Sequence, residues 1–261
     1  MSRSRRTGRR SPLASVALLL IGLLATGGAY ALVTSSATAS TSSAVATQAE
    51  DGEKLFLANC SSCHGIGAIG TTDAPSLVGV GAAAVDFQVG TGRMPMAASG
   101  PQAEVKPVQF TEEQIEALAV YVATLGDGPG IPTDATLTSG DDVAAGAELF
   151  RINCAMCHNV AGAGGALTEG KYAPPLQNID PAHVYEAMVT GPQNMPVFND
   201  LNITPEDKAN IIAYLDYLDN NPSPGGLDLG SLGPVSEGLF VWIFALGAII
   251  AVTVWLTAKS N

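Results

Sequence analysis

The chain has 261 residues, enough for two small domains, and its 12 basic and 24 acidic residues give a formal net charge of −12. Five arginines lie within the first ten residues, so segment 34–234 has six Lys or Arg residues against 23 Asp or Glu residues, a net charge of −17. Nucleic acid is excluded as a partner of this segment, because phosphates bind to basic surfaces. An acidic surface favours a partner with a basic patch, or a chain held in place by anchors; alternatively, the acidic residues only keep the surface soluble.

Residues 1–33 combine an arginine-rich head with an apolar run from Leu13 to Val33. This pattern predicts an export signal or a signal-anchor helix whose basic end stays in the cytoplasm. The run is long enough to cross a bilayer, whereas residues 37–39 (Ala-Thr-Ala) resemble a signal-peptidase site, so both cleavage and retention stay open. Segment 34–49 is rich in Ser, Thr and Ala, and this composition predicts a flexible linker.

A five-residue motif, Cys60-Ser61-Ser62-Cys63-His64, occurs a second time as Cys154-Ala155-Met156-Cys157-His158. The two copies contain all four cysteines of the chain and two of its three histidines. Cys-x-x-Cys-His is typical of covalent c-type haem attachment. Two thiols on one helical turn can form thioethers to the two vinyl groups of one porphyrin, and the adjacent histidine can then bind the iron.

Other uses of four cysteines fit the sequence less well. Two disulfides would leave the repeated histidine unexplained. A four-cysteine zinc site usually has its pairs roughly 15–20 residues apart, whereas these pairs lie 94 residues apart. A thioredoxin-like redox pair requires a βαβ context, and the sequence has none. We therefore predict two c-type haems, bound covalently by Cys60, Cys63, Cys154 and Cys157.

The similarity between the two halves extends well beyond the cysteines. The matched segments are Gly52–Cys60 with Gly146–Cys154, Ala74–Leu77 with Ala173–Leu176, Gly92–Pro95 with Gln193–Pro196, and Phe110–Tyr121 with Ile203–Tyr214. The offset is 94 residues at the cysteines, 101 at the methionines and 93 at the tyrosines. Fixed anchors separated by loops of variable length indicate a duplicated domain.

Each half resembles a class I cytochrome c domain, over residues 52–125 and 146–218. The resemblance implies an all-α fold with two tandem domains, at 50–127 and 142–221, joined by a connector at 128–141. It implies that His64 and His158 are the proximal iron ligands. It also implies that the backbone carbonyls of Pro75 and Pro174 accept hydrogen bonds from the two histidine rings.

The same resemblance makes Met94 and Met195 the distal iron ligands. Each lies in a loop, precedes a proline and comes before the last helix of its domain. Met96 is an alternative to Met94. Met188 has no counterpart in the first half, so we assign it to the core. His183, the remaining histidine, is assigned to the surface.

The last helix of each half has a recognisable start and a buried face. Thr111 and Thr204 are good N-cap residues, and each is followed by acidic residues, including Glu113 and Asp207. Apolar residues then recur with helical period. These residues are Ile115, Leu118, Ala119 and Val122 in the first half, and Ile211, Ile212, Leu215 and Leu218 in the second.

The C-terminal part predicts a linker at 222–234 and a transmembrane helix at 235–258, because residues 239–258 carry no charge. Trp242 and Trp255 lie near its ends, as interfacial aromatics do, and Lys259 favours a cytoplasmic end. Both termini then lie in the cytoplasm if the N-terminal helix is retained. The haem domains lie on the extracytoplasmic side of the cell membrane, where thiols need not stay reduced.

Two class I domains between two membrane helices resemble the dihaem cytochrome c subunit of actinobacterial cytochrome bc complexes. The resemblance implies partnership with cytochrome b and Rieske iron–sulfur subunits, and single-electron transfer through two haems to the copper centre of a terminal oxidase. The chain would be part of a quinol–cytochrome c reductase without an active site of its own. Two alternatives stay open: a free-standing, membrane-tethered dihaem carrier, and the cytochrome subunit of a periplasmic dehydrogenase.

Overall fold

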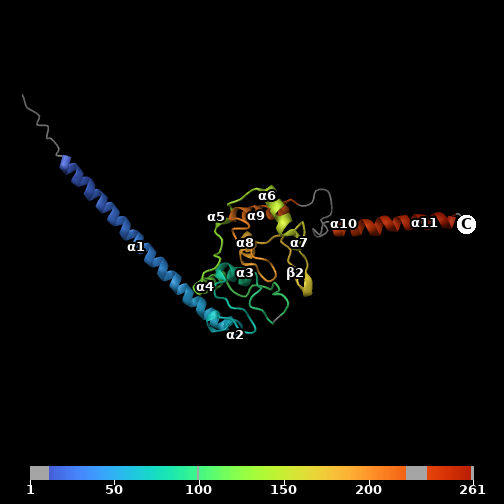
Figure 1. Ribbon diagram of the computed structural model, residues 1–261, viewed down its shortest axis with the longest axis horizontal. Coiled ribbons are helices and arrows are strands. Elements are labelled where there is room, and N and C mark those ends of the chain that lie inside the picture. Colours follow the sequence, from blue (N-terminus) through green and yellow to red (C-terminus); the bar gives the residue numbers. More distant parts are fainter. Residues whose placement is uncertain (1–11, 99, 222–233, 260–261) are drawn as a thin grey trace, which may run out of the picture.

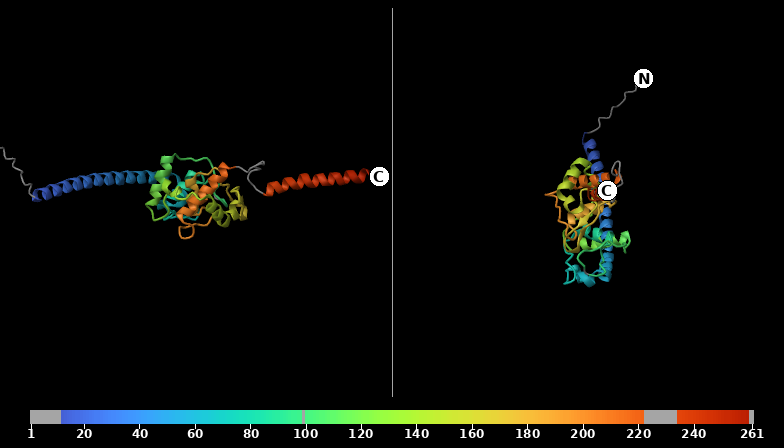
Figure 2. Two further views of the ribbon diagram at one scale, coloured as in Figure 1. Left: turned by 90° about the horizontal axis from the view of Figure 1, so that it is seen from above. Right: turned by 90° about the vertical axis from the view of Figure 1, so that its right-hand side faces the viewer.

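A computed structural model describes residues 12–98, 100–221 and 234–259 (Figure 1). A central, mostly helical body lies between two long helices that extend away from it on opposite sides (Figures 1 and 2). The predicted basic head, at residues 1–10, and nearly all of the predicted linker at 222–234 lie outside the described residues.

The body has two parts, which we call the first and second domains. The first domain contains the C-terminal part of α1 (Pro12–Asn59), α2 (Ser61–His64), η1 (Ile66–Ala68), α3 (Gly81–Gly90) and α4 (Glu112–Ala123). The predicted connector at 128–141 contains α5 (Asp134–Leu137), whose Leu137 packs against the core of the second domain. The second domain contains α6 (Val143–Asn153), α7 (Ala155–His158), β1 (Gly165–Ala166), η2 (Thr168–Gly170), β2 (Tyr172–Ala173), α8 (Pro181–Thr190) and α9 (Pro205–Asn220). The C-terminal helical run comprises α10 (Pro234–Val241), the π-helical turn η4 (Trp242–Leu246) and α11 (Gly247–Lys259).

In each domain the first and last long helices cross in close contact, α1 with α4 and α6 with α9. A Cβ atom added to Gly52 would lie 2.0 Å from the carbonyl oxygen of Ala117. At the equivalent crossing, a Cβ atom on Gly146 would lie 1.9 Å from the carbonyl oxygen of Asn210. Only glycine permits backbones to approach this closely.

An aromatic pair packs beside each crossing. Phe56 lies against Tyr121 with ring centroids 5.4 Å apart, and Phe150 lies against Tyr214 with centroids 5.5 Å apart. Both phenylalanines are fully buried and belong to the core clusters of their domains. In both halves the glycine and the phenylalanine lie four residues apart and therefore share one face of the first helix.

The predicted starts and buried faces of the last helices are confirmed. Thr111 caps α4 and Thr204 caps α9, each within a capping box that is completed by Gln114 or Asp207. The predicted apolar residues of both helices are buried, except that Leu218 is partly buried at the edge of its cluster. These faces supply four of the nine buried residues of the first core cluster and three of the seven of the second.

Two features differ from the sequence-based expectations. The fold is not purely helical, because β1 and β2 pair as a small antiparallel hairpin within the insertion that lengthens the second domain. Residues 34–49 continue α1 as helix and do not form the expected flexible linker. This segment contains five alanines and neither proline nor glycine, so nothing in it interrupts a helix.

Among the described residues, one helical run, Ser236–Lys259, is long and apolar enough to cross a membrane. Its apolar side chains are exposed. The apolar part of α1 is shorter, at Ser15–Ala31, than the run from Leu13 to Val33 that suggested an N-terminal span. The N-terminal segment is therefore only a short apolar candidate.

The two domains pack against each other through α3 and α8. The side-chain amide of Gln102, in the first domain, bonds both the backbone nitrogen and the backbone oxygen of Tyr172, at 2.8 and 2.9 Å. The backbone nitrogen of Ala103 donates to the side-chain oxygen of Gln193 at 3.4 Å. Loops of the first domain therefore lie directly against the second.

The glycine at each crossing gives a stability prediction. Gly146→Ala should lower the free energy of unfolding by about 1–3 kcal/mol, because the methyl group forces α6 away from α9. Gly130→Ala is the matched control, because its added Cβ would meet nothing within 4 Å. Thermal unfolding of the detergent-solubilised chain, followed by circular dichroism, measures both variants. Equal unfolding temperatures would contradict the role of the close crossing.

Candidate haem-binding sites

The two Cys-x-x-Cys-His motifs have the same backbone geometry. The amide of His64 donates to the carbonyl of Cys60 at 2.9 Å, and the amide of His158 donates to the carbonyl of Cys154 at 2.9 Å. In each motif the backbone amide of the second cysteine also donates to the backbone carbonyl of the first cysteine, at 3.1 Å. Each motif is therefore one tight turn that brings two thiols and an imidazole together.

A proline carbonyl orients each motif histidine. Nδ1 of His64 lies 2.8 Å from the carbonyl oxygen of Pro75, and Nδ1 of His158 lies 2.9 Å from that of Pro174. A carbonyl oxygen can only accept, so Nδ1 carries the proton and Nε2 presents a lone pair. The hydrogen bonds expected from the resemblance are confirmed in both halves.

The second site is a buried environment for its titratable groups. Burial lowers the pKa of His158, although the bond to Pro174 opposes this effect, so the imidazole is held neutral. Burial, followed by the nearby Cys157, raises the pKa of Cys154 to about 11. The pKa of Cys60 is raised for the same reasons, burial and then its partner Cys63. All four cysteines are free thiols, so the disulfide alternative is not supported.

A cavity of about 620 Å³ lies in the second domain. Cys154, Cys157, His158 and Met195 all line it, so the structure brings together the four predicted haem-binding residues of this half. Its remaining walls are largely apolar and include Pro174, Leu176, Phe198, Ile211 and Leu215. The volume lies within the range of cofactor pockets, about 300–1,000 Å³.

In the first domain, Cys60 and Met94 pack against the same apolar core cluster, which contains Phe56. The second domain repeats this arrangement with Cys154 and Met195. An imidazole nitrogen, a thioether sulfur and two free thiols on one turn are the groups that a c-type haem requires. The residues present therefore fit that cofactor in both domains.

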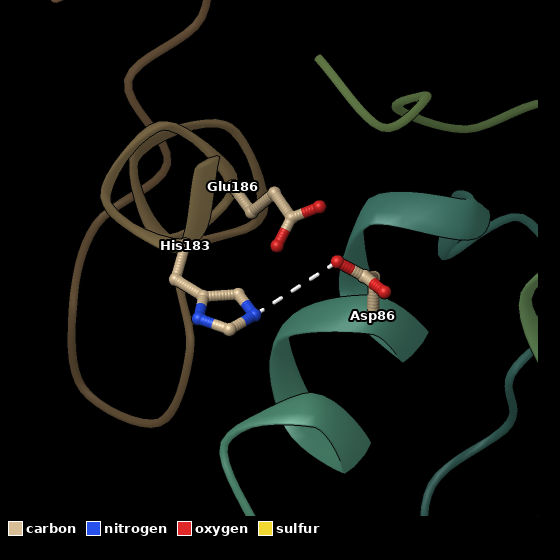
Figure 3. A group of neighbouring side chains, drawn as sticks. All are labelled: Asp86, His183 and Glu186. Atoms are coloured by element: carbon tan, nitrogen blue, oxygen red, sulfur yellow. Dashed lines mark ion pairs between the residues drawn. The ribbon is translucent and has the colours of Figure 1, made fainter. Parts of the chain in front are cut away.

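Two other side chains were assigned from the sequence. Met188 is buried in the second core, as predicted. The surface assignment of His183 was wrong, because its side chain is only 23% exposed and lies between α8 and α3 (Figure 3). The sequence shows a lone histidine in the second domain and does not indicate that this residue contacts α3 of the first domain.

Residues of the first domain also line the cavity of the second, and the sequence did not reveal them. They include Phe87, Arg93 and Gln102. The guanidinium of Arg93 lies 4.6 Å from the ring centroid of Phe87, and burial lowers the pKa of Arg93. Among the described residues, no carboxylate pairs with it. Arg93 precedes the predicted iron ligand Met94, and this was the only sign in the sequence of a position near a haem site. Its contact with the second cavity crosses between domains and leaves no local pattern.

This geometry defines a pair of cytochrome c-type domains. The family model of the cbb3-type cytochrome c oxidase subunit III matches the chain twice, over residues 47–122 and 141–215. Similar relatives are named cytochrome bc1 complex cytochrome c subunit. The relative from Corynebacterium efficiens is 45% identical over 80% of this chain and 76% of its own length. Those from Corynebacterium diphtheriae and Mycobacterium tuberculosis are 40% and 43% identical, over 99% of this chain and 98% and 96% of their own lengths.

The chain therefore belongs to the family of cytochrome c subunits of the cytochrome bc1 complex. Cytochrome c domains carry c-type haem, and the two domains here imply two haems. A subunit of this complex is associated with a membrane, and the helical run at Ser236–Lys259 is suited to that association.

Proposed function

We propose that this chain relays single electrons from the quinol-oxidising part of a cytochrome bc complex, formed by cytochrome b and a Rieske iron–sulfur protein, to a terminal cytochrome c oxidase. The observation that carries the proposal is the pair of matching haem sites in two domains that pack against each other, in a chain of this family. The match to a cbb3-type oxidase subunit supports an oxidase as the electron acceptor.

Each haem would be held by one domain, residues 50–127 and 142–221. Cys60 and Cys63 would form thioethers to the first haem, and Cys154 and Cys157 to the second. His64 with Met94, and His158 with Met195, would be the axial ligands. Bound in this way, haem supplies a one-electron redox centre whose potential is raised by thioether ligation.

The residues of this chain would orient the iron ligands, enclose each haem and hold it in place. The carbonyls of Pro75 and Pro174 keep the proton on Nδ1 of each histidine, which leaves Nε2 free to bind a metal. The buried aromatic and aliphatic walls exclude water, which favours the less charged state of a buried redox group. If a histidine and a methionine both bind each iron, neither site would keep an open position for a substrate, and the chain would act without an active site of its own.

The arrangement of the domains supports transfer in series. Met94, the proposed ligand in the first domain, is adjacent in the chain to Arg93, which lines the cavity of the second domain. Two consecutive residues, Arg93 and Met94, thus connect the second site with the first.

The helical run at Ser236–Lys259 would anchor the second domain in the cell membrane, and the apolar part of α1, if retained, would anchor the first. Basic residues at the outer ends of both segments favour cytoplasmic ends and extracytoplasmic haem domains. An anchored, acidic relay suits a fixed assembly better than diffusion between partners.

The proposed ligands predict redox potentials. Met195→His should lower the potential of the second haem, and Met94→His that of the first, each by on the order of 100 mV, because imidazole stabilises ferric iron better than a thioether does. Covalent attachment should stay intact in both variants. Potentiometric titration followed at the c-haem absorption bands measures this effect. Met96→His is the matched control for the first domain. A shift with Met96→His and none with Met94→His would move the ligand to Met96.

Arg93 predicts a second effect on potential. Arg93→Gln should lower the potential of the second haem by roughly 50–100 mV, because a cation close to the cavity stabilises the reduced state by about 1–2 kcal/mol at an effective dielectric constant of about 20. Arg151→Gln removes the same charge from an exposed position on α6 and serves as the control. Equal shifts in both variants would show that only the net charge matters.

Native purification tests the proposed assembly. After gentle detergent extraction through a tag on this chain, we expect b-type and a-type haem signals to accompany the c-type band, together with quinol oxidase activity. Elution of a lone polypeptide with two c haems would instead establish a tethered carrier. Elution with a dehydrogenase subunit would establish the other alternative.

A further inference from the structure

A cluster of three potential metal ligands lies where α3 of the first domain meets α8 of the second (Figure 3). Asp86 comes from α3, and His183 and Glu186 come from α8. One ligand atom from each residue lies within 4.8 Å of the other two. Nε2 of His183 is 3.9 Å from Oδ2 of Asp86. None of these residues belongs to a haem-attachment motif.

Glu186 is the residue that requires an explanation. Its side chain is fully buried, and neither carboxylate oxygen has a hydrogen-bond partner among the described residues. Burial, followed by the charge and the close side chain of Asp86, raises the pKa of Glu186 to about 9, so this group is a neutral acid at pH 7 unless a cation binds it. A buried carboxylate without a donor is costly, and most such groups in proteins are paired or bind a metal. The fully buried Lys208 of the same domain does not serve it, because its amine binds Asp200 and the carbonyl of Ile203.

We propose that Asp86, His183 and Glu186 bind a divalent transition-metal ion, for which Zn²⁺ is the best match, and that this ion joins the two domains. One imidazole nitrogen and two carboxylate oxygens are ligands that Zn²⁺ accepts at about 2.0–2.2 Å. Tetrahedral coordination at that distance places ligand atoms roughly 3.3–3.6 Å apart. Nε2 of His183 and Oδ2 of Asp86 are 3.9 Å apart, and all three ligand atoms lie within 4.8 Å of one another, so side-chain movements of roughly 1 Å would close the site. A cation here also supplies the positive charge that two opposed carboxylates lack.

The surroundings hold the ligands in place. His183 and Glu186 are three residues apart on α8, so their side chains share one face of the helix. The His183 ring meets Phe87 edge-on, with centroids 6.2 Å apart and an interplanar angle of 83°. A Cβ atom on Gly90 would lie 3.1 Å from Nε2 of His183, so the absence of a side chain there gives the imidazole its space. The fourth coordination position would be taken by water.

An ion at this position would fix the first domain against the second. The proposed ion would bind residues of α3 and α8 and none of the proposed iron ligands, although His183 also lines the cavity of the second domain. If the relay operates as proposed, the same ion would also hold constant the separation of the two haems.

The haem-loaded, full-length chain, freed of loosely bound metal with a chelator, tests the site by zinc titration. We expect one tightly bound zinc per chain by elemental analysis, and a higher unfolding temperature when zinc is present. Glu186→Gln and Asp86→Asn should each weaken zinc binding by more than about tenfold, because even changes to groups behind the ligands cost that much. Glu116→Gln, on the exposed face of α4, should bind zinc as the wild type does.

X-ray absorption at the zinc edge identifies the ligands without interference from iron, and we expect one imidazole together with oxygen ligands. If Glu186→Gln does not fold, Asp86→Asn decides the matter, because Asp86 is partly exposed. Equal zinc binding by the wild type and Asp86→Asn would overturn the proposal. So would a wild type whose unfolding temperature does not respond to zinc, which would leave a proton shared by the two carboxylates as the occupant.

Discussion

The close crossing of the first and last helices in each domain determines where the core residues and the cysteine turn lie. Gly52 against Ala117, and Gly146 against Asn210, allow the backbones to touch, so the phenylalanine one turn further on meets the tyrosine of the opposite helix. The cysteine turn begins one residue after the first helix ends, so its position is set by the same crossing. Core packing and the geometry of the haem site are therefore one property of the fold.

The two domains are better described as one unit than as two independent modules. The cavity of the second domain is completed by Phe87, Arg93 and Gln102 of the first. Hydrogen bonds between Gln102 and the backbone of Tyr172 fix a loop of the first domain against the hairpin that lines this cavity. The environment of the second site, including its nearby positive charge, thus depends on the position of the first domain. This dependence suits a relay in which the relative position of the two sites matters.

Much of each domain could be predicted from local patterns, because the Cys-x-x-Cys-His turns, the caps at Thr111 and Thr204 and the helical apolar stripes report on nearby residues. The histidine-to-proline bonds were expected from the resemblance to class I cytochromes c. What could not be predicted arises between segments far apart in the chain. His183 and Asp86 lie 97 residues apart in the chain, and Arg93 reaches a cavity formed mainly by residues 150–215, so neither contact leaves a periodic signal. The helix through residues 34–49 was not predicted, because the many Ser and Thr residues suggested a flexible linker. The segment nevertheless contains no proline or glycine that would interrupt a helix.

Rapid mixing of a reduced quinol with the natively purified assembly, in the absence of oxygen, tests the central claim most directly. The absorption bands of c-type and a-type haem report separately on this chain and on the oxidase. If this chain is the relay, the c-type bands become reduced before the a-type band does, and electrons reach the a-type haem only after passing through this chain. Reduction of the a-type haem while the c-type bands stay oxidised would contradict it.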